Sequence, residues 1–386
     1  MDIKEIFTVM VERDASDVYL TVAKPPMYRI EGKVEPIGEA SFEVDDLRAL
    51  AAEIMNERQR NEFAETMEMN LALALPGVAR FRVNVFQQRG SVGMVIRRIK
   101  ADPPTLGELK LPPVISEIAM SRRGLALLVG STGSGKSTTL AAIIDHRNVN
   151  EAGHIITIED PIEFVHRHKN SIVTQREVGF DTLSFQSALK NTLRQAPDVI
   201  LIGEIRDTET MEAAITFAET GHLCLATLHS NNANQAIERI MNFFPPERHA
   251  QIYLQLSLNL RAIVSQRLVR SIEGKRVVAM EIMMDTPRIK DLIKKGEVDI
   301  LKEGMEQGIR EGCQTFDQAL FELYKEGKIA LDQALANADS ANNLRLKIKL
   351  AGLKLDEEPK EAAEIDPGQG RPELLQAAAG FRLRKT

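Results

Sequence analysis

The sequence predicts an α/β fold in which a mixed α+β domain, residues 1–100, precedes a core domain with a parallel sheet, residues 114–285. The length is the first observation, because 386 residues correspond to two or three domains of roughly 150 residues each. The second is a change of pattern near residue 100. Apolar and polar residues alternate before it, whereas short uninterrupted apolar runs separated by helical segments follow it. Such runs are typical of a parallel sheet buried on both faces.

The composition is that of a globular protein. Hydrophobic residues make up 44% of the chain and charged residues 27%, a balance that can bury a sizeable core. The net charge of −6 and the 5% of aromatic residues, with no tryptophan, disfavour a basic protein that stacks on nucleic-acid bases. We therefore expect no nucleic acid among the partners.

The N-terminal residues and the cysteines predict a cytoplasmic location. The first fifteen residues are interrupted by charges and lack the apolar core of a signal peptide, and no apolar run approaches the roughly 18 residues of a transmembrane helix. Cys224 and Cys313 are far apart and belong to no C-x-x-C pair. This pattern predicts no zinc module and fits a reducing compartment.

Residues 1–100 are predicted to contain four strands and one helix. The strands are expected at 18–22, 27–30, 79–86 and 92–99, and the helix from 44 to about 65. Alternation in the strand 79–86 predicts one apolar face, Phe81, Val83 and Val85, and one polar face, Arg80, Arg82 and Asn84. The arginine face is a candidate site.

A proline-rich stretch separates this domain from the core. Residues 101–113 contain four prolines and are expected to form an interdomain linker. The core strands are expected at the apolar runs 125–129, 155–158, 199–202 and 223–228. From 286 to about 338 the pattern is helical, and a stripe at helical spacing is expected to face the core rather than a cofactor: Phe316, Leu320, Leu323 and Tyr324.

The stretch 339–386 is predicted to contain a strand-like segment and a disordered tail. Residues 344–350 alternate strictly between apolar and basic side chains, as in a half-buried strand. Two interpretations follow, an edge strand of the protein's own sheet or a strand that pairs with a partner. Residues 356–372 are acidic and rich in proline and glycine, which predicts disorder.

The clearest motif is a glycine-rich loop of the form G-x-x-x-x-G-K-S. An apolar run precedes it and a helical pattern follows it, which is the strand–loop–helix arrangement that phosphate binding requires. Lys136 is expected to neutralise the β- and γ-phosphates and Ser137 to bind Mg²⁺. The predicted ATP-binding residues are Gly130, Ser131, Thr132, Gly133, Ser134, Gly135, Lys136, Ser137 and Thr138.

A carboxylate suited to catalysis follows the buried strand 199–202. Ligands of open α/β sheets bind at the carboxyl ends of the strands, so Glu204 is expected to take a proton from an attacking water. Gly203 stands where many P-loop enzymes have an aspartate for the metal. We therefore expect Mg²⁺ to be held by Ser137 and, through water, by Glu204.

Acidic residues also follow the strand 155–158. They are Glu159, Asp160 and Glu163. One interpretation is that they support the metal and the attacking water. The other is that they cap a helix or lie in solvent.

Histidines stand at both ends of the strand 223–228. His222 precedes it and His229 follows it. Each is either a structural histidine or a sensor of the γ-phosphate. The sensor role is favoured for His229 and is evenly balanced for His222.

Four motifs in order resemble those of one family. They are similar to the Walker A, Asp-box, Walker B and His-box motifs of the secretion and type IV pilus ATPases, and they occupy residues 130–137, 156–163, 203–207 and 219–229. Residues 15–18 and 80–84 resemble the N-terminal domain of that family. The resemblance covers about residues 1–335. It implies a PAS-like domain followed by a RecA-like ATPase core.

Within this family the chain resembles the compact retraction ATPases. The extension ATPases carry extra N-terminal modules and a four-cysteine zinc insertion, and this sequence has neither. Compared with PilT proteins, Ser131 replaces the usual proline and residues 286–293 depart from the AIRNLIR segment. Residues 337–350 and the tail resemble the PilU branch of the PilT/PilU group.

The resemblance implies a function and partners. It predicts a homo-hexameric Mg-ATPase that drives type IV pilus retraction and twitching motility, together with a PilT-type ATPase. The ring is expected at the cytoplasmic face of the inner membrane, where it would act on the pilus platform protein. The alternatives are a pilus-assembly or type II secretion ATPase, a nucleic-acid translocase, or a scaffold whose own turnover matters little.

The resemblance also points to four arginines. Arg82 and Arg97 match the arginine fingers of the family, and a cation supplied by another domain makes hydrolysis depend on closure. Because neighbouring residues of a strand face opposite ways, either Arg97 or Arg98 is expected to point away from the core. Arg206 and Arg239 are candidates for intersubunit contacts or for surface salt bridges.

Overall fold

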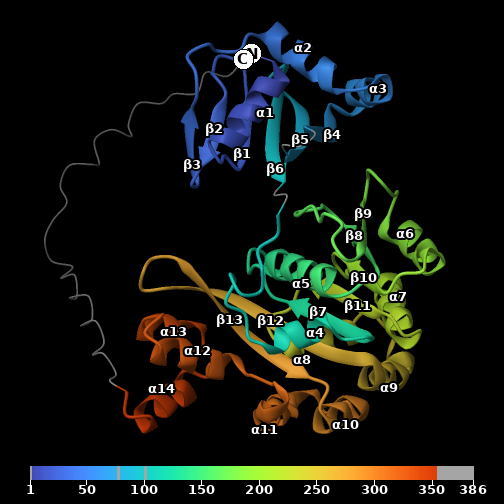
Figure 1. Ribbon diagram of the computed structural model, residues 1–386, viewed down its shortest axis with the longest axis vertical. Helices are drawn as coiled ribbons and strands as arrows, with labels where there is room; N and C mark the ends of the chain where they lie inside the picture. Colours follow the sequence, from blue (N-terminus) through green and yellow to red (C-terminus); the bar gives the residue numbers. More distant parts are fainter. Residues whose placement is uncertain (1, 76–78, 100–101, 354–386) are drawn as a thin grey trace, which may run out of the picture.

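The computed structural model describes residues 2–75, 79–99 and 102–353. A small N-terminal domain lies at one end of the molecule, and the larger core domain forms the rest (Figure 1). Residues 102–113 connect the two without a helix or strand of their own. None of the helices in the described ranges combines the length and the apolar character needed to cross a membrane.

The N-terminal domain is an antiparallel sheet with three helices. Its described strands follow the order β3-β2-β1-β6-β5-β4. They are β1 (Asp17–Leu20), β2 (Met27–Ile30), β3 (Lys33–Pro36), β4 (Glu68–Leu75), β5 (Ala79–Gln88) and β6 (Ser91–Ile99), and the helices are α1 (Ile3–Glu12), α2 (Val44–Ile54) and α3 (Glu57–Thr66). Phe81, Val83 and Val85 are fully buried, which confirms the predicted apolar face of β5. Phe7 of α1 stacks on Phe81 with ring centroids 4.0 Å apart.

Two expectations for this domain were wrong in detail. The single helix predicted from 44 to 65 is interrupted at Met55, whose backbone is extended. Asn56 then starts α3, because its side chain accepts a hydrogen bond from the backbone N–H of Gln59. The Gln59 side-chain oxygen in turn accepts a hydrogen bond from the backbone N–H of Asn56. Strands β3 and β4 were not predicted. All of β3 is exposed, so it has no apolar face for a pattern to reveal.

The core domain is built on a mostly parallel sheet. Its described strands follow the order β13-β12-β7-β11-β10-β8-β9, and only β13 is antiparallel to its neighbour. The strands are β7 (Gly124–Val129), β8 (His154–Glu159), β9 (Ile172–Glu177), β10 (Val199–Ile202), β11 (Leu223–Leu228), β12 (Leu260–Arg270) and β13 (Arg276–Met284). The four predicted core strands are confirmed as β7, β8, β10 and β11, whereas the edge strands β9 and β13 and the inner strand β12 were missed.

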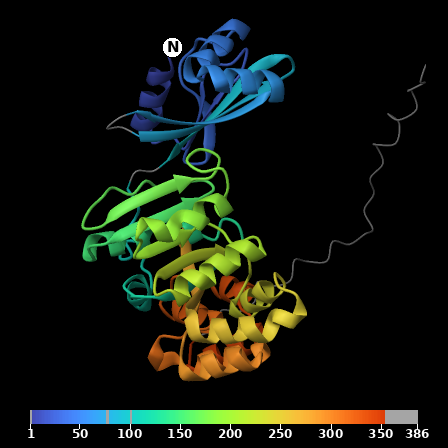
Figure 2. The same ribbon diagram turned by 90° about the vertical axis from the view of Figure 1, so that its right-hand side faces the viewer.

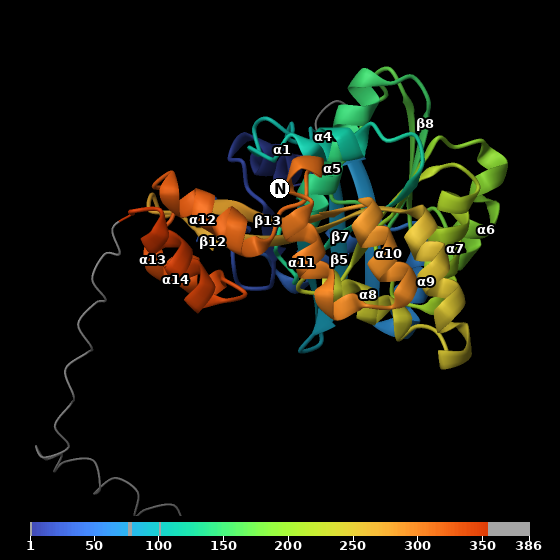
Figure 3. The same ribbon diagram turned by 90° about the horizontal axis from the view of Figure 1, so that it is seen from below.

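Helices surround this sheet, and the last of them form a separate group. They are α4 (Val114–Ala119), α5 (Lys136–Asn150), α6 (Phe185–Thr192), α7 (Thr208–Glu219), α8 (Ala233–Met241), α9 (His249–Asn259), α10 (Pro287–Lys295), α11 (Leu301–Gln307), α12 (Phe316–Lys325), α13 (Leu331–Asn337) and α14 (Ala341–Leu350). Seen from below, α12, α13 and α14 stand to one side of the core (Figure 3). Phe316 and Leu320 are fully buried in this group, which confirms a core-facing stripe.

The segment 344–350 is a helix, so the predicted strand was wrong. Leu344 and Ile348 are fully buried against α12, while Leu346 and Leu350 are exposed. Strict alternation places apolar residues four positions apart as well as two, and the four-residue spacing fits one face of a helix. Ser340 caps α14 through the backbone N–H of Asn343. Both interpretations that required a strand are therefore excluded.

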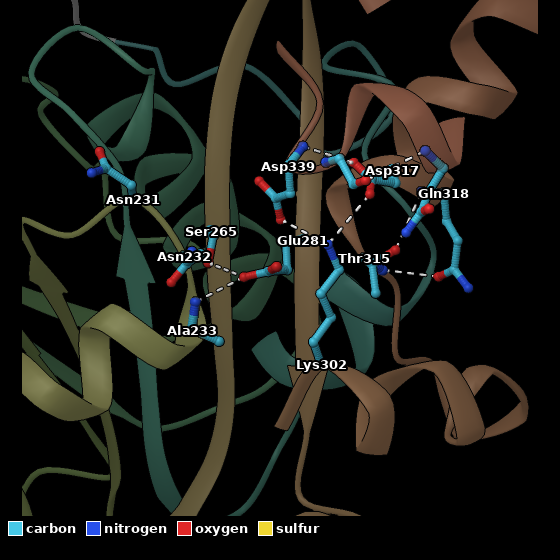
Figure 4. Close-up of polar contacts among 12 residues, drawn as sticks. Asn231, Asn232, Ala233, Ser265, Glu281, Lys302, Thr315, Asp317, Gln318 and Asp339 are labelled. Atoms are coloured by element: carbon cyan, nitrogen blue, oxygen red, sulfur yellow. Dashed lines mark hydrogen bonds and ion pairs between the residues drawn. The ribbon is translucent and has the colours of Figure 1, made fainter. Parts of the chain in front are cut away.

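A polar network fastens this helical group to the core (Figure 4). The Lys302 ammonium lies 3.3 Å from both Asp317 and Asp339, and the Asp339 N–H donates to Asp317. Asp339 also pairs with Arg267 of β12, whose guanidinium lies 3.7 Å from the Phe316 ring.

A buried carboxylate, Glu281 of β13, lies beside this network. It accepts a hydrogen bond from the backbone N–H of Ala233 at the start of α8, and burial raises the pKa of Glu281 to about 6.

Candidate nucleotide-binding site

One cavity at the carboxyl ends of the parallel strands gathers most of the predicted residues. Strands β7, β8, β10 and β11 run in the same direction, so the loops that follow them meet at one edge of the sheet. The cavity has a volume of about 350 Å³. Its lining includes Lys136, Ser137, Glu159, Asp160, Glu163, Glu204, Arg206 and His229.

The glycine-rich loop between β7 and α5 is tightly packed. Gly130, Gly133 and Gly135 have positive φ angles of 154°, 78° and 92°, which glycine adopts without strain. A Cβ on Gly130 would lie 2.5 Å from the Ser134 Oγ, and one on Gly135 would lie 2.7 Å from the Gln266 Nε2. Gly130 and Gly135 are therefore required by both conformation and space, and Gly133 is required by its conformation alone.

The loop holds two polar side-chain groups in its interior, the Lys136 ammonium and the Ser134 hydroxyl. The Lys136 Nζ donates to the backbone carbonyls of Gly130 and Ser131 at 2.8 and 2.9 Å, so its ammonium lies inside the loop. Burial lowers the pKa of Lys136, and the negative charges of Glu204 and Glu163 oppose that shift. The Ser134 Oγ is buried without a hydrogen-bond partner among the described residues, and a buried hydroxyl of this kind calls for one.

Gln266 supports the loop and was not predicted. It lies on β12 and is buried. Its Nε2 donates to the Ser134 carbonyl at 2.8 Å, and its Oε1 accepts from Thr139 of α5 at 2.9 Å. A single glutamine inside an unrecognised strand carries no motif, and only the sheet order reveals its position.

Glu204 stands between a histidine and an arginine. Its Oε1 lies 3.2 Å from the His229 Nε2, and its Oε2 accepts from the Arg206 Nη2 at 2.7 Å. The hydrogen bond to Glu204 raises the pKa of Arg206, which also lies 3.9 Å from Asp160. Within one subunit, Arg206 therefore makes salt bridges at the cavity.

Close strand packing explains Gly203. Its N–H donates to the Ile158 carbonyl at 2.7 Å, and its carbonyl accepts from the Thr227 hydroxyl at 2.6 Å. A Cβ at this position would lie 3.1 Å from both the Glu159 Cα and the Ile158 carbonyl oxygen. An aspartate here would require the end of β8 to shift by a few tenths of an ångström.

The acidic segment after β8 faces the cavity. No helix begins between residues 159 and 163, which are described throughout, so the capping interpretation was wrong. Glu159 accepts hydrogen bonds from Thr157 at 2.6 Å and Gln175 at 3.1 Å, and burial raises its pKa to about 7. Glu163 lies close enough to Lys136 for its charge to raise the lysine pKa.

The two histidines lie at opposite ends of the inner strand β11. His229 follows β11 and contacts Glu204, whereas His222 precedes β11 and contacts Thr220 at 3.0 Å and the Phe217 carbonyl at 3.2 Å. The six residues of β11 separate them, roughly 20 Å at about 3.3 Å per residue. A γ-phosphate sensor at His222 is therefore excluded.

Three further cavities border the loop, and two of them bear on the predicted residues. One, of about 480 Å³, contains Arg239 of α8 together with residues 130–132 and His229. The other, of about 640 Å³, lies between the linker and the β12–β13 hairpin. Its lining combines Gly135 and Thr138 with the apolar side chains Leu109, Leu111, Leu268 and Val278.

The N-terminal arginines lie outside the 350 Å³ cavity. The Arg82 Nη2 lies 3.1 Å from the Glu177 Oε1 at the end of β9, so this side chain crosses to the core domain. Arg97 pairs with Asp17 at 2.8 Å inside its own domain. Arg98 points to the other side of the sheet and pairs with Asp14, which confirms that the two neighbours face opposite ways.

Comparisons with known proteins place the chain in a family. Residues 1–322 match the family described as type II/IV secretion system protein. The chain is 55% identical to the type IV pilus ATPase PilU of Pseudomonas aeruginosa over 91% of this chain and 92% of that protein. It is 43% identical to the pilus retraction ATPase PilT of the same organism, over 89% of this chain and all of that protein.

A solved structure agrees with these sequence relatives. The crystal structure of the pilus retraction motor PilT with bound ADP superposes with a TM-score of 0.84 at 42% identity, covering 90% of this chain and 99% of that chain. Its nucleotide-binding fold and the ordered motifs of the present sequence lead to one assignment. The chain belongs to the secretion ATPase family, in the group of P-loop pilus ATPases that contains PilT and PilU.

Proposed function

We propose that this protein hydrolyses ATP with Mg²⁺ and uses the energy to retract type IV pili. The observation that carries the proposal is the single cavity in which the phosphate loop meets Glu204 and His229. The similarity to a PilU protein over nine-tenths of the chain supports the link to pili. The PilT relative is named for pilus retraction, which favours retraction over assembly.

The residues of the loop fit a triphosphate. Backbone N–H groups of a glycine-rich loop and the N-terminus of α5 attract phosphate oxygens. Lys136 lies inside the loop, and the unpartnered Ser134 hydroxyl is a further donor. The 640 Å³ cavity beyond Thr138 combines apolar walls with polar atoms, so the base and ribose are assigned to it.

The donor set also fits Mg²⁺. Ser137 and Glu204 line the same cavity, and magnesium in such sites uses few protein oxygens in addition to phosphates and waters. Ser137 would hold the ion directly and Glu204 through water, because Gly203 supplies no carboxylate at the position between β10 and Glu204. When bound, the ion neutralises charge that develops on the phosphates.

Glu204 is the base in this proposal. It accepts the proton of the attacking water, while His229 and Arg206 fix its two oxygens. His229 thereby senses the γ-phosphate side of the cavity. Glu163 contributes negative charge near Lys136, and Glu159 and Asp160 complete the wall behind it.

Arginines from outside the cavity make hydrolysis depend on movement. Arg82 extends from the N-terminal domain to the core, and Arg97 lies directly opposite it on β6. Closure of this domain over the nucleotide would bring their charges to the phosphates. Arg239 beside the loop, and His222 at the far edge, are left as candidate contacts between subunits.

The working assembly is proposed to be a homo-hexameric ring. The PilU-like sequence supports joint action with a PilT-type ATPase at the cytoplasmic face of the inner membrane. There the ring would move the pilus platform protein.

A substitution in Glu204 tests the chemistry. Glu204→Gln in the purified full chain should lower ATP turnover by about 10²–10⁴-fold, while ATP binding measured by calorimetry persists. Lys136→Ala should lose binding as well. Glu209→Gln is the matched control, since Glu209 is an exposed glutamate on α7. Full turnover in Glu204→Gln would show that another group is the base.

Imaging of pili tests the biological role. Native cells that lack this protein should carry more or longer pili that retract poorly, and a further deletion of the PilT-type ATPase should show whether the two act together. Few or no pili would indicate an assembly ATPase. Full rescue by Glu204→Gln beside an active partner would indicate a scaffold.

A further inference from the structure

One buried carboxylate touches both domains and has no part in the chemistry described above. Glu177 is the last residue of β9, and its side chain is 1% exposed. Its Oε1 lies 3.1 Å from the Arg82 guanidinium of the N-terminal domain. Its Oε2 accepts the backbone N–H of Ile162 at 3.3 Å. The two oxygens therefore serve two different parts of the molecule.

The second contact reaches the wall of the cavity. Ile162 is itself buried and directly precedes Glu163, which lines the cavity beside Lys136. Strands β8 and β9 pair in parallel with Glu177 opposite Glu159. Glu177 thus holds the backbone of the acidic segment 159–163 from behind, without entering the cavity. Figures 1 and 2 show β9 on the side of the core that faces the N-terminal domain.

The first contact completes a row of charges across the N-terminal sheet. Arg29, Asp17, Arg97 and Arg82 lie opposite one another on β2, β1, β6 and β5. Asp17 pairs with both Arg29 and Arg97. Arg82 is left beside a like charge, which is unfavourable on a sheet face. The carboxylate that balances it comes from the core domain.

We propose that Glu177 is a positioning residue that couples the position of the N-terminal domain to that of the segment carrying Glu163. The inference rests on the proposed function of the cavity. A buried carboxylate that loses its cation is strongly destabilised, so Glu177 keeps Arg82 and the Ile162 backbone in a fixed relation. When Arg82 moves away, the charge of Glu177 is left unbalanced directly behind Glu163.

Two substitutions in Glu177 separate its two contacts. Glu177→Gln keeps an oxygen for the Ile162 N–H and removes the charge that holds Arg82. Glu177→Ala removes both contacts. Asp14→Asn is the matched control, because Asp14 is exposed and its pair with Arg98 stays within the N-terminal domain.

The coupling is tested by measuring amide hydrogen exchange in the full chain, with and without a non-hydrolysable ATP analogue. Glu177→Gln should speed exchange in residues 79–88 severalfold and leave 160–169 near the wild-type rate, whereas Glu177→Ala should speed both. Asp14→Asn should change neither segment. Unchanged exchange at 79–88 in Glu177→Gln would overturn the coupling, as would faster exchange of 160–169 alone.

Turnover provides a second reading. Glu177→Gln should lower kcat by about tenfold with KM little changed, and adding it to Arg82→Gln should lower kcat no further. If the reductions in kcat multiplied in the double variant, Glu177 would act independently of Arg82.

A second variant is available if Glu177 variants do not fold. Arg82→Gln, at a partly exposed position, should alter exchange at 160–169, and no change there rejects the proposal. A wild-type chain without ATPase activity would refute the proposed function but leave the exchange result interpretable.

Discussion

The two sheets of this protein present their polar side chains differently. The N-terminal sheet is antiparallel and carries a row of charged side chains on one face, with Arg97 directly opposite Arg82. The core sheet is mostly parallel and its central strands are buried on both faces, so Lys136 and Glu204 lie beyond the carboxyl ends of β7 and β10. A sheet face moves as one body, whereas a sheet edge gathers groups from distant parts of the chain. The chemistry is therefore assigned to the core edge, and movable charge to the N-terminal face.

The largest expected change in the free energy of unfolding concerns the N-terminal sheet alone. Phe81→Ala removes a fully buried ring that stacks on Phe7, and should lower the free energy of unfolding of this domain by about 3–5 kcal/mol. Because the chain has no tryptophan, circular dichroism during urea unfolding is the suitable measurement. ATP binding by the core should persist.

Val34→Ala on the exposed strand β3 is the control for this prediction. Its unfolding should differ from the wild type by less than about 0.5 kcal/mol. If Phe81→Ala abolished ATP binding, the proposed division between the two sheets would fail.

The next effect concerns the core edge and depends on pH. The folded-state pKa of Glu159 is about 7, above its ordinary value, so the folded state holds this proton more tightly than the unfolded state does. Stability from this group is fully present below about pH 4.5 and is lost as the pH rises through 7, by about 3–4 kcal/mol in total. Glu159→Gln should therefore gain stability relative to the wild type between pH 5 and 8.

Glu281→Gln is the comparison for the pH effect. Burial raises the pKa of Glu281 to about 6, which is a smaller shift than that of Glu159. The stability that Glu281 contributes should therefore be smaller, and it should be lost at a lower pH than that of Glu159. Glu281 does not line the cavity, and added nucleotide should leave its contribution unchanged. Parallel unfolding curves for wild type and Glu159→Gln at every pH would contradict the assigned burial.

The smallest effect tests the helical group at the end of the described chain. Leu346 is exposed on α14, so Leu346→Ala should change the free energy of unfolding by less than about 0.5 kcal/mol. Leu344 is buried two residues earlier, and Leu344→Ala should cost about 2–5 kcal/mol. Equal losses at both positions would favour a strand, in which the two side chains share one face.

Sequence patterns located the cavity because its chemistry is carried by contiguous motifs. Lys136 and Ser137 close one contiguous motif and begin α5, and Glu204 lies two residues after a buried apolar run. The same reasoning failed for Gln266 and Glu177, because their contacts are distant in the sequence. Gln266 contacts Thr139, 127 positions away, and Glu177 contacts Ile162, 15 positions away. Neither position stands out without knowledge of which strands are neighbours.

Misassigned elements have a shared physical cause. The alternation at 344–350 fits a strand, but Leu344 and Ile348 also fit one turn of a helix, and packing against Phe321 and its neighbours decided between them. A sensor role for His222 was evenly balanced because it borders the correct strand, yet the strand direction puts it at the opposite end of β11. Direction and tertiary contacts are properties that a local pattern does not contain.

The close approach of β8 and β10 at Gly203 also restricts how this protein can evolve. A direct carboxylate ligand at this position requires a wider gap between the strands before the side chain can be accepted. A change from glycine to aspartate is therefore coupled to a shift of the neighbouring strand by a few tenths of an ångström. Changes in metal handling that leave the strands in place have to arise from the neighbouring loops.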